Sequence, residues 1–266
     1  MTVHQSELQV ETAFGLKGKV ALVVGGYGAI GTSISQALAV AGATSIVAGR
    51  DGERADMLAG RLRDEGWTAE GIGLDACDTA DIRKQVASVA QLHGSVDILV
   101  NCLGFNKEQK LLEVTEEAFD EVYSRTLRPA MFLSQAVATQ QVASGRGGSH
   151  IHLLSVRSAL GFRGRGYSAF CAAKGGLATL LKQQAIELAQ HNITVNGVAP
   201  GAVRTHKNDK ALEDPETFRR AVADIPIGRL ATPADVAGAV HFLASRQARF
   251  VTGQILYVDG GLTASA

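Results

Sequence analysis

Short runs of hydrophobic, β-branched residues alternate along the chain with longer segments in which hydrophobic residues recur every three or four positions. The short runs predict buried strands, and the longer segments predict amphipathic helices. The predicted strands cover residues 19–24, 44–48, 70–74, 96–100, 150–155, 193–198 and 254–258. Because strands and helices alternate, right-handed crossovers should join the strands into one parallel sheet with helices on both faces. We therefore predict an α/β fold consisting of a single doubly wound domain with a seven-stranded parallel sheet.

The extent of this domain follows from the same pattern. We predict that residues 15–266 form the domain and that the polar residues 1–14 form a flexible N-terminal extension without the features of a targeting peptide. The segment at about 202–232 has no predicted strand, carries many charges and contains Pro215, which favours a helical lid. No hydrophobic run approaches the ~18 residues that a membrane-spanning helix requires.

The charge balance limits the classes of partner. Lysine plus arginine and aspartate plus glutamate both number 26, so the formal net charge is zero. A neutral protein is a poor match for nucleic acid or for an anionic membrane surface, and we expect neither as a partner. The chain has three cysteines without metal-like or C-x-x-C spacing, which favours reduced thiols and a cytoplasmic location.

A glycine-rich turn, "VVGGYGAIG", follows the first predicted strand and precedes an amphipathic helix. This order presents free backbone N–H groups and the positive end of a helix to a pyrophosphate, and so predicts a dinucleotide site. The alternative is an ordinary glycine turn. Its position after the first strand of a doubly wound pattern favours the dinucleotide.

The turn and several later motifs together resemble those of the short-chain dehydrogenase/reductase family, which has a Rossmann fold. The family's loop reads TGxxxGxG, whereas this chain has Val24 in place of the Thr, Ala29 in place of the middle Gly, and Gly28 one position early. The similar motifs span about 250 residues and are "LDACD", "VNCLG", "VAPGAVRT", "IPIGRLATPADVAGAVHFLAS" and "VTGQILYVDGG".

The resemblance implies a set of cofactor-binding residues. Asp75 would meet the adenine, Asn101 and Gly104 would lie near the adenosine ribose, and the Val203 backbone with Thr205 would hold the nicotinamide amide. The full implied set is Gly25, Tyr27, Gly28, Ala29, Ile30, Gly31, Arg50, Asp75, Ala76, Asn101, Gly104, Lys174, Pro200, Gly201, Val203 and Thr205.

The end of the second predicted strand bears on the choice between NAD and NADP. An acid at this position accepts the ribose hydroxyls of NAD and repels the 2′-phosphate of NADP. This chain has Gly49 and Arg50 instead, and a guanidinium can bind a phosphate through two hydrogen bonds. We therefore expect NADP, with NAD as the alternative if Arg50 only stacks on the adenine and Asp51 reaches a hydroxyl.

The stretch "YSAFCAAKGG" predicts the start of a helix with Tyr167, Phe170 and Lys174 on one face. An ammonium near a phenol favours the phenolate and lowers the pKa of the tyrosine, which suits proton transfer. Tyr167, however, lies two turns from the lysine, and Phe170, one turn away, has no hydroxyl. A role for Tyr167 as surrogate requires a shift of one turn, ~5.4 Å, so packing at the start of the helix is its more ordinary role.

The family resemblance assigns four catalytic positions, occupied in the family by Asn, Ser, Tyr and Lys. Ser155 matches the serine, with Ser158 as a second candidate, and Lys174 matches the lysine. Phe170 stands at the tyrosine position and Thr126 at the asparagine position. Phe170 is either a natural departure or an inactivating substitution, and Thr126 retains a hydroxyl that could hold a relay water.

The loops after the predicted strands should carry the substrate pocket, and they contain more basic than acidic residues. This excess suggests an anionic small molecule, although some of these side chains could instead face solvent or a subunit interface. The candidate substrate-binding residues are Ser155, Arg157, Arg163, Arg165 and His206. His150 and His152 point the same way from one strand, but without a third ligand we predict no metal site.

Together these features predict an NADP-dependent oxidoreductase that transfers a hydride between nicotinamide and a secondary alcohol or ketone. The alternative is a cofactor-binding protein of the same fold with a non-redox or regulatory role, because the usual phenol is absent. The resemblance also implies a homotetramer.

Overall fold

The computed structural model describes residues 13–206 and 208–265 and contains one seven-stranded parallel sheet. The strand order is β3-β2-β1-β4-β5-β6-β7. The strands are β1 (Val20–Val24), β2 (Thr44–Gly49), β3 (Ala69–Gly73), β4 (Ile98–Asn101), β5 (Gly148–Leu153), β6 (Ile193–Pro200) and β7 (Ile255–Val258). Each of the seven predicted strands is present with its bounds displaced by at most two residues, and the predicted fold class is confirmed.

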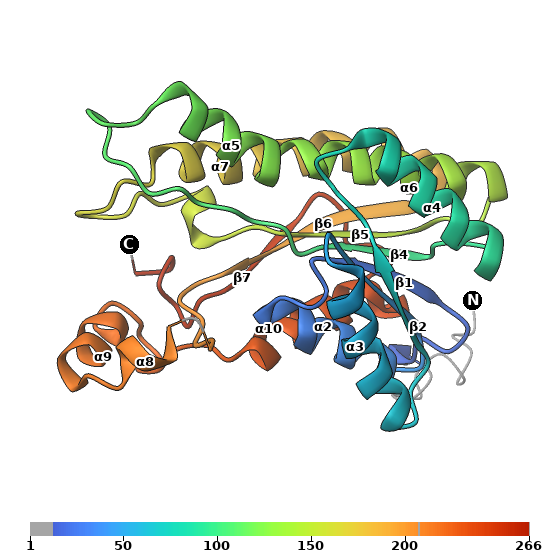
Figure 1. Cartoon of the computed structure of the whole chain (residues 1–266), viewed down its shortest axis with the longest axis horizontal. Helices are drawn as coiled ribbons and strands as arrows, with labels where there is room; N and C mark the ends of the chain where they lie inside the picture. The colour runs from blue at the N-terminus through green and yellow to red at the C-terminus, as the bar shows by residue number, and fades with distance from the viewer. Residues whose placement is uncertain (1–12, 207, 266) are drawn as a thin grey trace, which may run out of the picture.

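Helices cover both faces of the sheet (Figure 1). On one face lie α4 (Thr79–His93), α5 (Glu116–Thr126), α6 (Arg128–Ser144) and α7 (Ser168–Leu188). On the other face lie α2 (Ala29–Val40), α3 (Gly52–Asp64) and α10 (Pro233–Ala244). Three short 3₁₀ turns are η2 (Val156–Ser158), η3 (Ala189–His191) and η4 (Arg246–Ala248).

The segment predicted as a helical lid forms two short helices, α8 (Asp209–Leu212) and α9 (Pro215–Val222). They lie beyond the ends of β6 and β7 and away from the two helical layers (Figure 1). Leu212, Ile225 and Leu230 form a small buried cluster of their own there. The helices are thus present, and the lid role stays a prediction.

Residues 1–12 of the predicted flexible extension lie outside the described residues. The last two residues of that range, Ala13 and Phe14, are helical, and Ala13 is buried. His241 Nε2 on α10 lies 2.8 Å from the Phe14 carbonyl oxygen. Ala13 and Phe14 therefore pack onto the domain, in contrast to the flexible extension predicted for residues 1–14.

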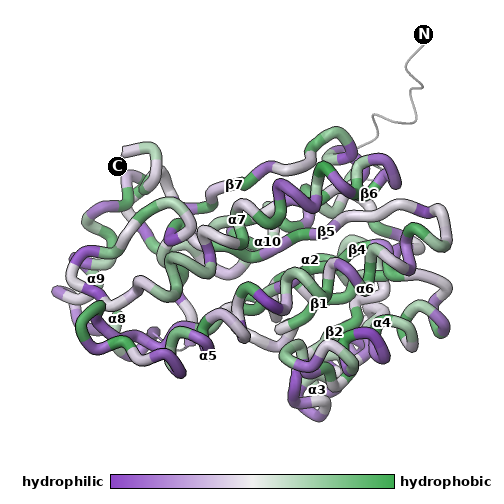
Figure 2. The backbone as a smooth tube through the Cα atoms, turned by 90° about the horizontal axis from the view of Figure 1, so that it is seen from above, coloured by the Kyte–Doolittle hydropathy of each residue, from purple (hydrophilic) through white to green (hydrophobic). Residues whose placement is uncertain are grey.

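The hydrophobic core consists of two main layers, one on each side of the sheet. One layer packs the central strands against α2 and α10 and includes Ile34, Leu38 and Val240. The opposite layer packs the strands against α4 and α6 and includes Ile82 and Leu133. Figure 2 shows hydrophobic colouring along β1 and mixed colouring along an outer helix such as α3. Burial on both faces explains why β1, in the middle of the sheet, is a continuous hydrophobic run.

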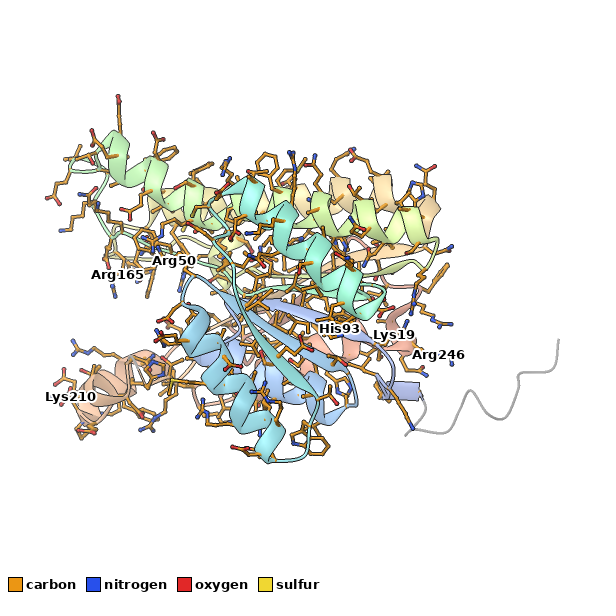
Figure 3. The ribbon with its side chains drawn as sticks, turned by 45° about the vertical axis from the view of Figure 1, so that its right-hand side comes forward. Lys19, Arg50, His93, Arg165, Lys210 and Arg246 are labelled. Atoms are coloured by element: carbon orange, nitrogen blue, oxygen red, sulfur yellow. The ribbon has the colours of Figure 1, made fainter. Side chains whose placement is uncertain are left out.

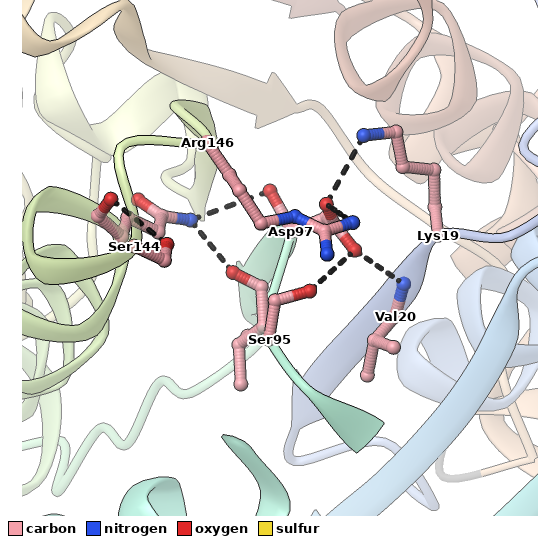
Figure 4. A network of polar contacts seen from close by, with 8 residues as sticks. Lys19, Val20, Ser95, Asp97, Ser144 and Arg146 are labelled. Carbon is pink, nitrogen blue, oxygen red and sulfur yellow. Dashed lines mark hydrogen bonds and ion pairs between the residues drawn. The ribbon is translucent and has the colours of Figure 1, made fainter. Parts of the chain in front are cut away.

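A polar cluster at the amino ends of the strands joins β1 to the start of β4 (Figure 4). The buried Asp97 carboxylate accepts hydrogen bonds from the Val20 N–H, the Lys19 ammonium and the Ser95 hydroxyl, each at 3.0 Å. Arg146 approaches the same carboxylate at 3.5 Å. Burial alone would raise the pKa of Asp97, but these hydrogen bonds outweigh it and lower that pKa below its ordinary value. The cluster is structural and lies at the opposite edge from the predicted site.

Figure 3 separates the two edges of the sheet. Lys19, His93 and Arg246 lie on one side of the molecule, while Arg50, Arg165 and Lys210 lie on the other. The second side is the carboxyl edge, where β1, β2, β4, β5 and β6 end. In doubly wound sheets, ligands bind at this edge.

Candidate functional site at the carboxyl edge of the sheet

The glycine loop between β1 and α2 is folded too tightly for larger residues at two positions. Gly25 has φ +79°, a left-handed conformation that favours glycine. A Cβ atom added to Gly31 would lie 2.2 Å from the Gly25 carbonyl oxygen. Ala29 is already the first residue of α2, so a methyl group in place of the family's middle glycine is accommodated.

The start of α2 suits an anion. Gly28, its N-cap residue, makes no side-chain cap, and the first turn contains no acidic residue. The first N–H groups of the helix and its positive end are therefore available to a phosphate. These features fit the pyrophosphate of a dinucleotide, while Ile30 packs against the core below.

A cavity of about 480 Å³ continues from the start of α2 to the loop after β6. Its lining includes Tyr27, Ala29, Thr32, Arg204, Thr205 and His206. The structure thus brings Thr205, implied to bind nicotinamide, to the same space as the glycine loop. His206 lies there as well, on the cofactor side of the edge.

The loop after β6 is braced by Asn208. Its Oδ1 accepts from the Thr205 N–H at 2.7 Å, and its Nδ2 donates to the Val203 carbonyl at 2.9 Å. Gly201, which follows Pro200 at the end of β6, packs tightly, because a Cβ there would lie 3.0 Å from the Asp259 Cα. The backbone that would hold the nicotinamide amide is therefore fixed.

The residues at the ends of β2 and β3 have free polar groups. Arg50 is exposed, and no residue within the described ranges pairs with its guanidinium. Asp51 instead caps α3, accepting from the Arg54 N–H at 3.1 Å. Asp75 is exposed, and one of its oxygens accepts from the Cys77 N–H at 3.0 Å, which leaves the other oxygen for a ligand. Ala76 beside it is buried.

Lys174 is the most enclosed charged group of the site, with 2% of its surface exposed. Its ammonium donates to the Leu153 carbonyl at 2.6 Å and to the Leu103 carbonyl at 3.2 Å. A Cβ at Gly104 would lie 3.3 Å from the same nitrogen, so Gly104 leaves space for the ammonium. Burial lowers the pKa of Lys174 to about 8. The lysine therefore joins the ends of β4 and β5 to α7.

Phe170 and Tyr167 lie on α7 or at its start, near this lysine. The Lys174 nitrogen is 5.8 Å from the Phe170 ring centroid, and the Phe170 ring packs in an apolar cluster with Val122 and Phe105. Tyr167 makes an edge-on contact with Phe170, with ring centroids 5.9 Å apart. The apolar surroundings of Phe170 suit a phenyl ring without a hydroxyl. The Phe170 ring contacts both Lys174 and Tyr167.

Thr126 is fully buried at the end of α5, and its hydroxyl is already paired. The oxygen accepts from the Phe105 N–H at 3.0 Å and donates to the Phe105 carbonyl at 3.1 Å. A hydroxyl has only one proton to donate, and here that proton goes to the backbone. Thr126 therefore braces the loop after β4.

Ser155 lies between β5 and η2, and η2 packs against α7. The Ser155 hydroxyl oxygen accepts from the Arg157 N–H at 3.1 Å, so its proton remains available for a substrate oxygen. The second candidate, Ser158, donates its proton to the Ser155 carbonyl at 2.7 Å. This geometry favours Ser155 over Ser158 as the donor to a substrate.

His150 and His152 belong to a buried hydrogen-bonded chain rather than to a metal pair. The chain runs from Asn101 to His152 (3.3 Å), Ser134 (3.2 Å), His150 (3.2 Å) and Gln141 (3.0 Å). The amides of Asn101 and Gln141 are oriented by backbone partners, which assigns Nε2–H to both imidazoles. Burial lowers the pKa of His150 to about 3 and that of His152 to about 4. Asn101 thus points its side chain inward and has only its backbone for a cofactor.

The arginines predicted to bind substrate differ in whether their guanidinium groups already have hydrogen-bond or ion-pair partners. Arg165 forms a two-pronged ion pair with Glu108, and its Nε lies 2.6 Å from Oε1. Arg157 donates to the Gly161 carbonyl and lies over the Phe162 ring, 3.9 Å from its centroid. Arg163 is exposed, and within the described part of the chain it has no ion-pair partner. The local positive charge is therefore smaller than the residue count suggests.

Several groups that build the site have no signature in the sequence. The carbonyls of Leu103 and Leu153 and the backbone of Phe105 hold Lys174 and Thr126, and backbone groups carry no residue signal. Within residues 13–206 and 208–265, no group of three or more metal-binding side chains occurs. In the same ranges, no helix combines the length and hydropathy needed to cross a bilayer.

Comparisons with known proteins match nearly the whole chain. Residues 26–263 match the family model described as enoyl-(acyl carrier protein) reductase. The chain is 36% identical over 248 residues to L-rhamnose 1-dehydrogenase (NAD(P)(+)) of Azotobacter vinelandii, covering 92% of this chain and 96% of the relative. It is 32% identical over 252 residues to gluconate 5-dehydrogenase of Gluconobacter oxydans, covering 95% and 97%.

Solved structures give the same result. A gluconate 5-dehydrogenase from Burkholderia cenocepacia, in complex with NADP and tartrate, superposes with a TM-score of 0.91 at 32% identity, covering 97% of this chain and 100% of that one. The family-model match begins inside the glycine loop, at residue 26, and includes Lys174 and the strands β2 to β7. With this agreement in sequence, in topology and along almost its entire length, the chain belongs to the short-chain dehydrogenase/reductase family.

Proposed function

We propose that this protein is an oxidoreductase that prefers NADP and interconverts a secondary alcohol and a ketone. The observation that carries the proposal is the enclosed Lys174 ammonium, held by two strand-end carbonyls between the glycine loop and Ser155. Burying an ammonium costs free energy unless it has hydrogen-bond partners. Buried groups with a perturbed pKa occur most often at functional sites. The relatives named as dehydrogenases support the same reaction class.

Different residues of the site would bind different parts of the cofactor. The N–H groups at the start of α2 would hold the pyrophosphate, and the loop braced by Asn208 would hold the nicotinamide end through Val203 and Thr205. Lys174 would bind the nicotinamide ribose. When bound, the nicotinamide supplies the two-electron redox chemistry.

On the substrate side, Ser155 would donate its free hydroxyl proton to the substrate oxygen. Phe170 offers no oxygen at the position where the family's tyrosine exchanges a proton, so the proton of the alcohol would pass to water or to a weaker group. We infer that chemistry in this chain is slow relative to cofactor binding.

A second candidate is a cofactor-binding protein with a non-redox or regulatory role. Two observations favour it: the missing oxygen at Phe170 and the Thr126 hydroxyl, which both accepts from and donates to the Phe105 backbone. Absorbance assays with NADPH or NADP and a panel of polyols, sugar acids and ketones separate the candidates. Turnover by the natural chain supports the oxidoreductase, whereas tight cofactor binding without turnover, even after Phe170→Tyr, supports the second candidate.

For the substrate we propose a small polyhydroxylated molecule, because relatives include an L-rhamnose and a gluconate dehydrogenase. Arg163, the arginine of the loop without a described partner, would favour a carboxylate. A comparison of KM for a sugar acid and for the matching neutral polyol tests this. A lower KM for the acid that disappears in Arg163→Ala supports the anionic substrate, and equal values contradict it.

We further propose a homotetramer. An apolar groove of about 590 Å³ lies over α6 and α7 and is lined by residues such as Met131, Val142 and Leu180. Leu256 on β7 and the nearby Ile227 are also exposed, at 42% and 65%. Two separate apolar surfaces suit two kinds of subunit contact. Light scattering should give a mass near four 27.8 kDa chains, and a monomer would contradict the proposal.

A further inference from the structure

Tyr27 of the glycine loop lies across Gly49 at the end of β2. A Cβ atom added to Gly49 would lie 2.4 Å from the Tyr27 Cε1 and 2.8 Å from its Oη. Contacts this short do not occur in real structures, so the ring stands where a side chain at position 49 would begin. The ring also packs on the buried cluster that contains Val47 and Leu58, which holds it in place.

The phenol of Tyr27 is oriented by the backbone. Its oxygen accepts a hydrogen bond from the Asp51 N–H at 3.0 Å. The hydroxyl proton, in contrast, has no acceptor among the described residues. A phenol can donate and accept at once, so this group presents one free donor. The free donor lies at the strand end that meets the adenosine ribose in this fold.

The surroundings of this donor are cationic. The Arg54 guanidinium lies over the Tyr27 ring, 4.7 Å from its centroid, and Arg50 is exposed without a described ion-pair partner. The nearest acid, Asp51, accepts from the Arg54 N–H as the cap of α3. The phenol thus has one guanidinium over its ring, and Arg50 directly precedes Asp51, the residue whose N–H it accepts from. A free O–H donor in such cationic surroundings suits a phosphate monoester, whereas a carboxylate at position 49 would repel one.

We propose that Tyr27 and Gly49 act as one cofactor-specificity element. The Tyr27 hydroxyl donates to the 2′-phosphate of NADP, and the Tyr27 ring occupies the space that an acid at position 49 would need. This inference rests on the proposed preference for NADP and assigns it to a pair of residues. It implies that Gly49 cannot be exchanged for aspartate unless Tyr27 is made smaller.

The size coupling is tested without cofactor by thermal unfolding of Gly49→Ala, Tyr27→Ser and the double variant. Gly49→Ala should lower the Tm by roughly 3 to 10 °C through overpacking. The same change in the Tyr27→Ser background should cost less than about 2 °C. An equal cost of Gly49→Ala in both backgrounds would overturn the coupling.

The donor role is tested by fluorescence titration of NADPH and NADH. Tyr27→Phe keeps the ring and removes the oxygen, so it should weaken NADPH binding roughly tenfold and NADH binding less than twofold. Tyr257→Phe, which removes a phenol oxygen on β7, is the matched control and should change neither Kd. Equal effects of Tyr27→Phe on both cofactors, or no effect, would overturn the donor role.

An exchange of preference completes the test. Gly49→Asp alone should weaken both cofactors, whereas Gly49→Asp with Tyr27→Ser should bind NADH more tightly than NADPH. If Gly49→Asp alone binds NADH as tightly as the double variant does, Tyr27 and Gly49 do not act together in setting the cofactor preference. If the natural chain binds neither cofactor, the proposed function fails with it. Cofactor binding with an unchanged preference in the double variant refutes this inference alone.

Discussion

Both ends of the predicted cofactor cleft depart from the family pattern, the adenosine end at Val24, Gly28 and Ala29, but the departures differ in their consequences. At the adenosine end, the loop from Gly25 to Gly31 and the polar groups at Arg50 and Asp75 are in place. At the catalytic end, Lys174 and Ser155 are present, but Phe170 and Thr126 stand where the family has tyrosine and asparagine. Binding depends on backbone shape, which tolerates many sequences, whereas proton transfer depends on single oxygen atoms. A chain can therefore retain cofactor binding while its proton transfer becomes less efficient.

The largest effect is expected at the buried hydrogen-bonded chain that runs from Asn101 through His152 and His150 to Gln141. The folded-state pKa values of His150 and His152 are lowered, to about 3 and about 4, mainly by burial. Below the unfolded pKa of about 6.5, the unfolded chain takes up protons that the folded chain does not. Stability should therefore fall as pH falls, by about 2 kcal/mol per histidine at pH 5.

Urea unfolding between pH 7.5 and pH 5 measures this loss. His152→Asn keeps a hydrogen-bonding side chain and removes one titrating group, so it should show about half the pH dependence. His241→Gln, at a surface histidine, is the control and should behave as the natural chain does. An unfolding free energy that does not change over this range would contradict the prediction.

The next largest effect tests the contrast directly at the catalytic end. Phe170→Tyr adds one oxygen above a lysine that favours the phenolate, and general acid–base groups contribute roughly 10² to 10⁴ in rate. Turnover on a substrate that the protein already binds should rise about 100-fold, as measured by nicotinamide absorbance. Phe162→Tyr, which adds an oxygen to an exposed ring of the neighbouring loop, should have no such effect. A Phe170→Tyr variant that is no faster on any alcohol or ketone would refute the assigned role.

A smaller effect is expected at the adenosine end. Arg50→Ala removes a guanidinium without a described partner, so binding of NADPH should weaken roughly tenfold while that of NADH stays within about twofold. Parallel titrations of the two cofactors measure the ratio. Equal affinities in the natural chain, or an unchanged ratio in Arg50→Ala, would remove the basis for an NADP preference. Arg246→Ala, on the opposite side of the molecule from Arg50 (Figure 3), serves as a charge-matched control.

The smallest effect is expected at Tyr167. Its ring packs edge-on against Phe170 and Phe162, with centroids 5.9 and 5.3 Å apart, as expected for helix-start packing. Tyr167→Phe preserves these contacts and should change turnover less than about twofold in a steady-state assay. If Tyr167→Phe instead abolishes activity, the site has been rebuilt around this phenol, and the roles given to Phe170 and Tyr167 must be exchanged.

The fold was predictable from sequence because burial on both faces leaves hydrophobic runs at strands such as β1 and β2, and amphipathic helices separate the strands. The glycine loop was predictable because only glycine fits the contacts at Gly31. The rest of the site depends on contacts between distant segments. No sequence pattern places the Leu153 carbonyl next to Lys174 or the Tyr27 ring next to Gly49. Nor does one show that the Thr126 hydroxyl both accepts from and donates to the Phe105 backbone. The number of basic residues in the loops overstates their local positive charge for a related reason, since Glu108 lies on a different loop from Arg165, which it neutralises.

The buried chain from Asn101 to Gln141 has a direction. Every donor along it points toward Gln141, and the backbone at its two ends accepts only that arrangement. A reversal of one hydrogen bond would leave an imidazole nitrogen or an amide without a partner unless all of them reversed together. The two ring protons should therefore exchange with solvent no faster than the domain opens. In a nitrogen-15 NMR spectrum, both histidines should appear as a single Nε2–H tautomer whose signals persist long after transfer into deuterated water.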